Sequence, residues 1–194
     1  MRLPRWWAER GLPAREKVGQ HLVPGFDQLL SSASNVLTLI IMARLLAPAA
    51  YGQFAVAYAI VILVLGLSRD YLGTRVSLSP DPLHTAKSAL GLVLVAAVPV
   101  SCAYFIALTL YVGADESSMI GVLAVAIPVV CGQDTLRFGA VAAKRAQVAL
   151  ASDAVWMAFI LCLWVFDVPP LMALVLWLCG ALVGLLLAPC RTVR

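Results

Sequence analysis

Long apolar stretches alternate with short polar breaks along the whole chain. Six stretches are long enough to cross a bilayer as helices, because about 20 residues at roughly 1.5 Å rise span a hydrocarbon core of about 30 Å. They occupy residues 22–46, 51–68, 88–112, 118–138, 148–166 and 171–188. The pattern therefore predicts an all-α protein, an integral membrane bundle of six transmembrane helices. We expect a loop over 69–87, where Pro80 and Pro82 interrupt the sequence.

The first apolar stretch carries a polar stripe. At 100° per residue, Asp27, Ser31, Ser34 and Thr38 fall on one narrow helical face, and Asn35 lies on its flank. A carboxylate in hydrocarbon costs at least about 2.5 kcal/mol, so this face should turn away from lipid. We expect it to face other helices or a water-filled cavity.

Two interpretations of this stripe stay open. The hydroxyls and Asn35 either hold the helix to a neighbour by hydrogen bonds or line a substrate or ion pathway. Asp27 is either a functional acid in such a cavity or a residue that faces the cytoplasm from the first turn.

Basic residues are distributed unevenly between the two sides of the predicted bundle. With six spans and a cytoplasmic N-terminus, 13 of the 14 Lys and Arg residues lie in the inner segments, and Arg44 alone lies outside. These inner segments are 1–21, 69–87, 137–147 and 189–194. Cytoplasmic loops carry such an excess, so we predict a multi-pass plasma-membrane protein with both termini in the cytoplasm.

Further charges fall near the inner ends of later spans. Asp134 and Arg137 end the fourth span on one helical face, and Asp153 begins the fifth. Together with Asp27 they would surround an inward-facing vestibule, where carboxylates could bind cations and Arg137 could grip a diphosphate. The alternative is that these charges pair in a gate or reach interfacial water.

Composition supports the membrane assignment and argues against catalysis. The chain is 62% hydrophobic and 12% charged, with a mean hydropathy of +0.95. Its five cysteines lie in or beside apolar spans without ligand spacing, so we expect no metal site. The sequence has no phosphate-binding glycine loop, and its two histidines, His21 and His84, lie in polar segments near membrane boundaries, so we expect no cofactor and no enzymatic activity.

The polar head over 1–21 combines five basic residues with Trp6 and Trp7. It suits either a segment at the headgroup interface or a solvated tail. Because it adjoins a membrane span, anionic lipid is a better partner for it than nucleic acid. Near the other end, Gly180 and Gly184 have the spacing that favours close helix packing, and residues 189–194 form a short cytoplasmic tail.

One segment resembles a known family. The run ARLLAPAAYGQFAVAYAI, preceded by SSASNVLTLI, resembles the opening of polysaccharide flippases of the multidrug/oligosaccharidyl-lipid/polysaccharide exporter superfamily. In that family the first helix typically ends in an Arg-Leu-Leu-Gly-Pro-like motif, and a Tyr-Gly pair opens the second. Arg44, Pro48, Tyr51 and Gly52 carry the match.

The resemblance implies a transporter with two lobes of about six helices that moves a lipid-linked oligosaccharide, carried on a polyprenyl diphosphate, across the plasma membrane. The present chain, with 194 residues, would correspond to one lobe, the N-terminal half. It could be a half-transporter that forms a homodimer or pairs with a separate second lobe, a degenerate remnant, or an accessory protein of envelope polysaccharide assembly. A lobe of a cation-coupled drug antiporter is a further alternative.

Overall fold

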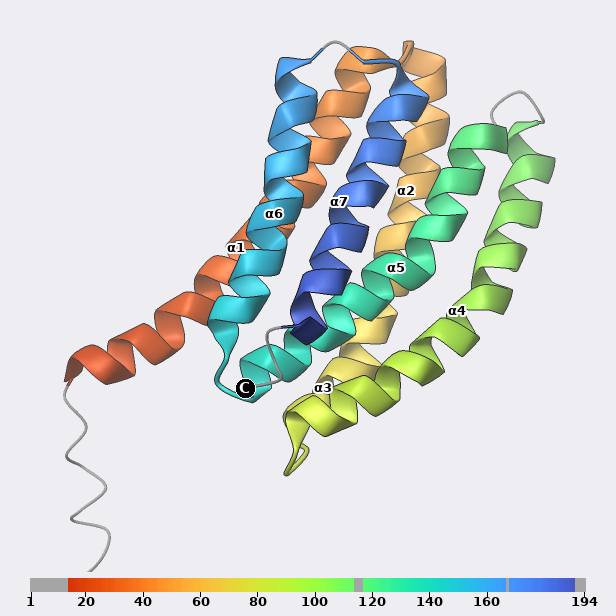
Figure 1. Cartoon of the computed structure of the whole chain (residues 1–194). Helices are drawn as coiled ribbons and strands as arrows, with labels where there is room; N and C mark the ends of the chain where they lie inside the picture. The colour runs from red at the N-terminus through yellow and green to blue at the C-terminus, as the bar shows by residue number, and fades with distance from the viewer. Residues whose placement is uncertain (1–13, 114–116, 167, 191–194) are drawn as a thin grey trace, which may run out of the picture.

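The computed structural model describes residues 14–113, 117–166 and 168–190, with side chains from residue 25 to residue 187 except that of Asp27. The described chain is entirely helical (Figure 1). Its elements are α1 (Ala14–Leu45), α2 (Pro48–Ser68), the π-helix η2 (Arg69–Gly73), α3 (Thr74–Ser77), α4 (Pro82–Val112), α5 (Ser117–Ala142), α6 (Ala146–Val165) and α7 (Pro170–Cys190). Six of these helical segments are long and apolar enough to cross a membrane. The prediction of an all-α bundle with six spans is confirmed.

Helix α5 is the centre of the bundle. About 72% of its span is buried inside the protein, against 17% for α4 at the edge. It packs against α2, α4, α6 and α7, and small residues on its surface allow these close approaches. A Cβ on Gly139 would lie 2.5 Å from the Cβ of Ala86 on α4, and a Cβ on Gly132 would lie 3.0 Å from Leu90.

The glycine pair of α7 also makes close contacts. A Cβ on Gly180 would lie 2.9 Å from Phe159 Cβ on α6, and one on Gly184 would lie 2.6 Å from Gln133 Nε2 on α5. The close packing that this glycine spacing favours is therefore present, on two sides of α7.

Helices α1 and α2 are consecutive in the chain and joined by a short turn. Helix α1 ends at Leu45, and Pro48 occupies the first turn of α2, where its missing N–H needs no partner. The two helices then diverge: α1 packs mainly on α6, whereas α2 packs on α5.

The expectation of a loop over 69–87 is wrong. The second span continues through η2 and α3 to Ser77, and α4 already begins at Pro82. The apolar pattern does not stop at Ser68, since Leu72 and Val76 are buried on the continuing helix. The Asp81 side chain accepts a hydrogen bond from His84 N at 3.2 Å and so caps α4, which shortens the break to a few residues.

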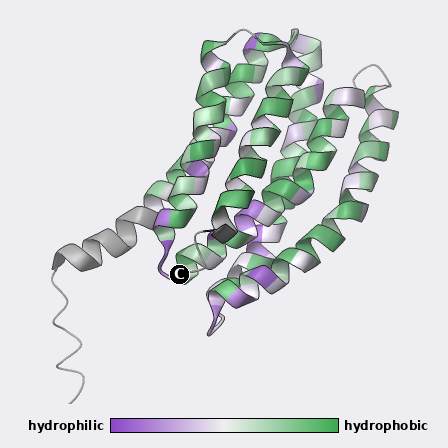
Figure 2. Cartoon of the chain, in the orientation of Figure 1, coloured by the Kyte–Doolittle hydropathy of each residue, from purple (hydrophilic) through white to green (hydrophobic). Residues whose placement is uncertain are grey.

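The two ends of the bundle differ in polarity (Figure 2). Green apolar residues cover most of each helix, and purple residues collect toward the end of the bundle that holds α3 and the α5–α6 turn. Many large apolar side chains on α4 face outward, among them Val95, Ile106 and Leu110, which are 73%, 58% and 82% exposed. Such faces suit a lipid environment, so the chain is a multi-pass helical membrane protein.

Candidate functional site

The polar stripe of α1 turns inward, as predicted. Ser31, Ser34 and Thr38 are 4%, 2% and 4% exposed, whereas Val36 and Ile40 on the opposite face are 55% and 43% exposed. Ser34 Oγ donates to the Ser31 carbonyl at 2.7 Å, and Thr38 Oγ1 donates to the Ser34 carbonyl at 2.8 Å. Both hydroxyl groups therefore donate their hydrogen bonds to backbone carbonyls of α1 itself.

The remaining stripe residues behave differently. Asn35 Oδ1 accepts a hydrogen bond from Tyr58 OH on α2 at 3.0 Å, which links α1 to α2. The backbone of Asp27 belongs to α1, but its side chain lies outside the described part of the structure. Asp27 therefore stays a prediction.

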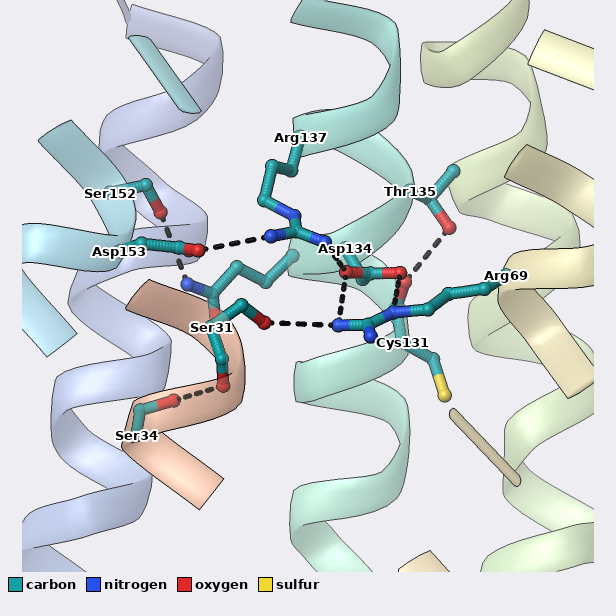
Figure 3. A network of polar contacts seen from close by, with 10 residues as sticks. Ser31, Ser34, Arg69, Cys131, Asp134, Thr135, Arg137, Ser152 and Asp153 are labelled. Atoms are coloured by element: carbon teal, nitrogen blue, oxygen red, sulfur yellow. Dashed lines mark hydrogen bonds and ion pairs between the residues drawn. The ribbon is translucent and has the colours of Figure 1, made fainter. Parts of the chain in front are cut away.

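The centre of the site is Asp134 on α5, which lies between two guanidinium groups (Figure 3). Arg69 donates to it twice, from Nε to Oδ2 at 2.9 Å and from Nη2 to Oδ1 at 3.0 Å. Arg137, one turn further along α5, approaches Oδ1 with Nη2 at 2.9 Å. The two-pronged contact with Arg69 is the strong, directional form of an arginine–carboxylate pair.

Two further helices join this centre. Arg137 Nη1 donates to Asp153 Oδ2 on α6 at 3.1 Å, and Arg69 Nη2 donates to Ser31 Oγ on α1 at 3.2 Å. We call Ser31, Arg69, Asp134, Arg137 and Asp153 the ion-pair network. It connects α1, η2, α5 and α6 near one end of the bundle.

The ion-pair network is buried and electrically balanced. The side chains of Asp134, Arg137 and Asp153 are 8%, 5% and 5% exposed, and that of Arg69 is 22% exposed. Two guanidinium groups offset two carboxylates, so the four side chains carry no net charge when ionised. Removing one member of a buried pair typically costs about 3–5 kcal/mol, because its partner keeps an uncompensated charge.

A smaller polar contact lies beside the network. Gln133 Nε2 on α5 donates to Ser152 Oγ on α6 at 3.1 Å, next to the Gly184 surface of α7. Gln133 Oε1 is buried and has no hydrogen-bond partner among the described residues. Polar groups thus continue from the ion-pair network toward α7.

Sequence reasoning missed Arg69 as a member of the site, because the second span was expected to end before it. A signal was present. Tyr58, Val61, Leu65, Leu72 and Val76 are all buried along one side of the continuing helix. Arg69 follows Leu65 by four residues and precedes Leu72 by three, so it belongs to the same helical face.

The π-helix is the local structure that bears Arg69. Segments of this type are rare and occur often at functional sites. Here η2 begins at Arg69 and is followed without a break by α3, so the guanidinium stays inside the bundle although Asp70 and Tyr71 beside it are exposed.

The residues of the family-like motif lie at the opposite end of the bundle. Arg44 is in the last turn of α1, and its guanidinium carbon lies 4.7 Å from the ring centre of Trp164 on α6. Tyr51 is half-buried and contacts Phe54, with ring centres 6.4 Å apart. Gly52 is exposed, and a Cβ on it would meet nothing within 4 Å.

Chemically, the ion-pair network contains guanidinium groups, which can bind anions, and carboxylates, which can bind cations, and here these groups bind one another. Among the side chains that the structure describes, no three His, Cys, Asp or Glu residues are grouped as metal ligands. No family model, curated protein or solved structure matches the chain.

Proposed function

We propose that this multi-pass membrane protein is a flippase-like transporter lobe for lipid-linked oligosaccharide precursors. The observation that carries the proposal is the ion-pair network inside the membrane-spanning bundle. Ionisable residues in spans are rare because they are costly, and in membrane proteins they mark substrate or ion pathways. The similarity of residues 43–54 to polysaccharide flippases supplies the substrate class.

In this proposal the network is a gate that can open. Arg69 is its most exposed member, and among the side chains of α1 that the structure describes it bonds to Ser31 alone. If α1 moved away from η2, Arg69 would keep Asp134 and gain room for an anionic group. A diphosphate is a suitable anion, because a guanidinium binds its oxygens with paired, charge-assisted hydrogen bonds.

The proposal places the protein in the plasma membrane with the network on the cytoplasmic side. There the diphosphate of a newly made lipid-linked glycan would be available. A second copy of the chain, or a separate six-helix partner, would complete the passage.

Reconstitution tests the transport activity directly. Proteoliposomes would contain the full chain and a fluorescent polyprenyl-diphosphate glycan, and a membrane-impermeant quencher would report which leaflet holds the probe. We expect protein-dependent exchange between leaflets. If the chain produces none, alone or with a co-expressed six-helix partner, the flippase proposal is wrong.

A second candidate function is a non-transporting accessory protein, in which the network only holds helices together. The burial of these charged side chains in contact with one another favours it, because buried ion pairs can be purely structural. The double variant Arg137→Leu, Asp153→Leu separates the two functions. It removes one buried pair while Arg69 and Asp134 keep each other, and such paired apolar replacements are often neutral for stability.

The double variant should therefore fold in either case. A transporter would lose activity, whereas an accessory protein would retain its cellular phenotype. The double variant Asp70→Asn, Arg75→Gln serves as the matched control. Both residues are exposed, and the variant removes one negative and one positive charge outside the ion-pair network.

A further inference from the structure

We infer that Arg44 and Trp164 form a second site, which binds the phosphate of a membrane lipid headgroup. The site lies at the end of the bundle opposite the ion-pair network. Arg44 is in the last turn of α1, Trp164 is the residue before the last of α6, and the membrane-spanning parts of both helices end there. This inference is independent of the proposed transport function.

The guanidinium of Arg44 is held in place by an aromatic face. Its central carbon lies 4.7 Å from the Trp164 ring centre, a distance typical of a cation–π contact. Stacking leaves the N–H groups at the edge of the guanidinium available to a ligand. In the part of the chain that the structure describes, no carboxylate or carbonyl accepts a hydrogen bond from Arg44.

A cavity lies beside this pair. Its volume is about 220 Å³, and Arg44 is the one charged residue among the described residues that line it. A cavity of only about 10–15 Å³ holds one water molecule, so this cavity has room for a group much larger than water. The other lining residues are apolar and include Ile41, Leu163 and Phe166.

This combination selects an anionic amphiphile. The guanidinium would bind phosphate oxygens through charge-assisted hydrogen bonds. Ile40, which is 43% exposed, and Leu161, which is 51% exposed, lie about one turn before Arg44 and Trp164 along their helices, where they can contact acyl chains. Inorganic phosphate would use the guanidinium but not these apolar surfaces.

Arg44 has to supply most of the attraction for a phosphate. The carbonyl end of α1 presents a partial negative charge, which opposes an anion there. Replacing Arg44 should therefore weaken phosphate recognition more than replacing any other residue that lines the cavity.

Native mass spectrometry of the purified full chain tests the site. The probes are dioleoylphosphatidylglycerol and dioleoylglycerol, which differ in the phosphate-bearing headgroup, with inorganic phosphate as competitor. We expect the unmodified protein to prefer the phospholipid. Arg44→Gln should weaken its tightest binding about tenfold, the factor expected for one lost charge-assisted hydrogen bond. The affinity of Arg44→Lys for the phospholipid should lie between those of the unmodified protein and Arg44→Gln. Lysine keeps the positive charge but lacks the planar, two-pronged guanidinium.

Two further variants make the test specific. Trp164→Leu keeps the charge but removes the stacking surface, and it should weaken binding while the protein still elutes as a folded species. Arg75→Gln removes an exposed arginine from the other end of the bundle and should change binding less than twofold, because it leaves this site intact. Equal losses in Arg44→Gln and Arg75→Gln, or equal binding of the two lipids, would overturn the inference. Competition by inorganic phosphate would overturn the lipid assignment.

Discussion

Arg69 and Asp134 lie 65 residues apart in the sequence and meet through two hydrogen bonds of 2.9 and 3.0 Å. Arg69 is on the π-helix that prolongs the second span, and Asp134 is on the central helix α5. This contact fixes the position of α2 against α5 near one end of the bundle. The stability of the bundle should therefore depend on this contact.

Replacing Asp134 by Asn should be strongly destabilising. Arg69 and Arg137 would then share a neutral amide in place of a carboxylate, and Asp153 would be the one remaining carboxylate of the network. We expect a loss of about 3–5 kcal/mol in the free energy of unfolding, measured by denaturation in mixed micelles. Asp70→Asn is the control, because Asp70 is exposed in the same π-helix. A similar small effect of both substitutions would contradict the structural importance of the pair.

Gly184→Ala should destabilise the contact between α5, α6 and α7. The added methyl group would lie 2.6 Å from Gln133 Nε2 and 2.9 Å from Ser152 Oγ. Gln133→Ala should partly rescue it by making room, and the double-mutant cycle should show a coupling of about 0.5–3 kcal/mol. Gly91→Ala is the matched control, since a Cβ there meets nothing within 4 Å. Strictly additive effects would show that the two side chains do not share this space.

Gly139→Ala should force two helix backbones apart. Its methyl group would lie 2.5 Å from the Cβ of Ala86 and 3.4 Å from the carbonyl oxygen of Pro82, and neither can rotate away. We expect α4 to shift from α5, with a lower midpoint of thermal unfolding. Ala86→Gly in the same chain should restore most of the loss, whereas a variant with an unchanged midpoint would disagree with the packing described above.

Tyr58→Phe should have a small effect on stability. It removes the 3.0 Å hydrogen bond to Asn35 but keeps the ring packed against Phe54 and Trp177. Interhelical hydrogen bonds in membranes contribute about 0.6 kcal/mol on average. Tyr58→Ala should cost several times more, because it also removes the buried ring. Equal losses for the two variants would assign the whole contribution to the hydroxyl.

Cysteine labelling can test the predicted orientation. In a cysteine-free background, His84→Cys should react with a membrane-impermeant maleimide only after the cell is opened, and Ser118→Cys should react in intact cells. Both positions are exposed and lie at opposite ends of the bundle. The reverse pattern would place both termini outside and would move the ion-pair network to the outer face.

The number of spans and the inward stripe of α1 could be predicted because both depend on local patterns. Apolar length alone locates six helices, and the spacing of Ser31, Ser34 and Thr38 identifies a buried face. The local contact between Asp134 and Arg137 was also accessible, because they lie one helical turn apart.

The partners of these charges could not be predicted in the same way. Arg69 and Asp153 come from other helices, and which helices meet is decided by packing between segments far apart in sequence. A hydropathy criterion also ended the second span too early, because Arg69 and Asp70 look like the start of a loop. The buried positions of Leu72 and Val76 show that helical periodicity is the better guide there.

The order in which the helices around α5 are synthesised affects how the protein is inserted into its membrane. During synthesis α2 and η2 emerge before α5, whereas α6 and α7 follow it, so Arg69 is already present when Asp134 arrives and Asp153 comes last. Asp134 and Arg137 can therefore compensate each other on a single nascent helix, before later segments enclose it. Helix α5 can thus enter the membrane with Asp134 and Arg137 already paired on its own surface.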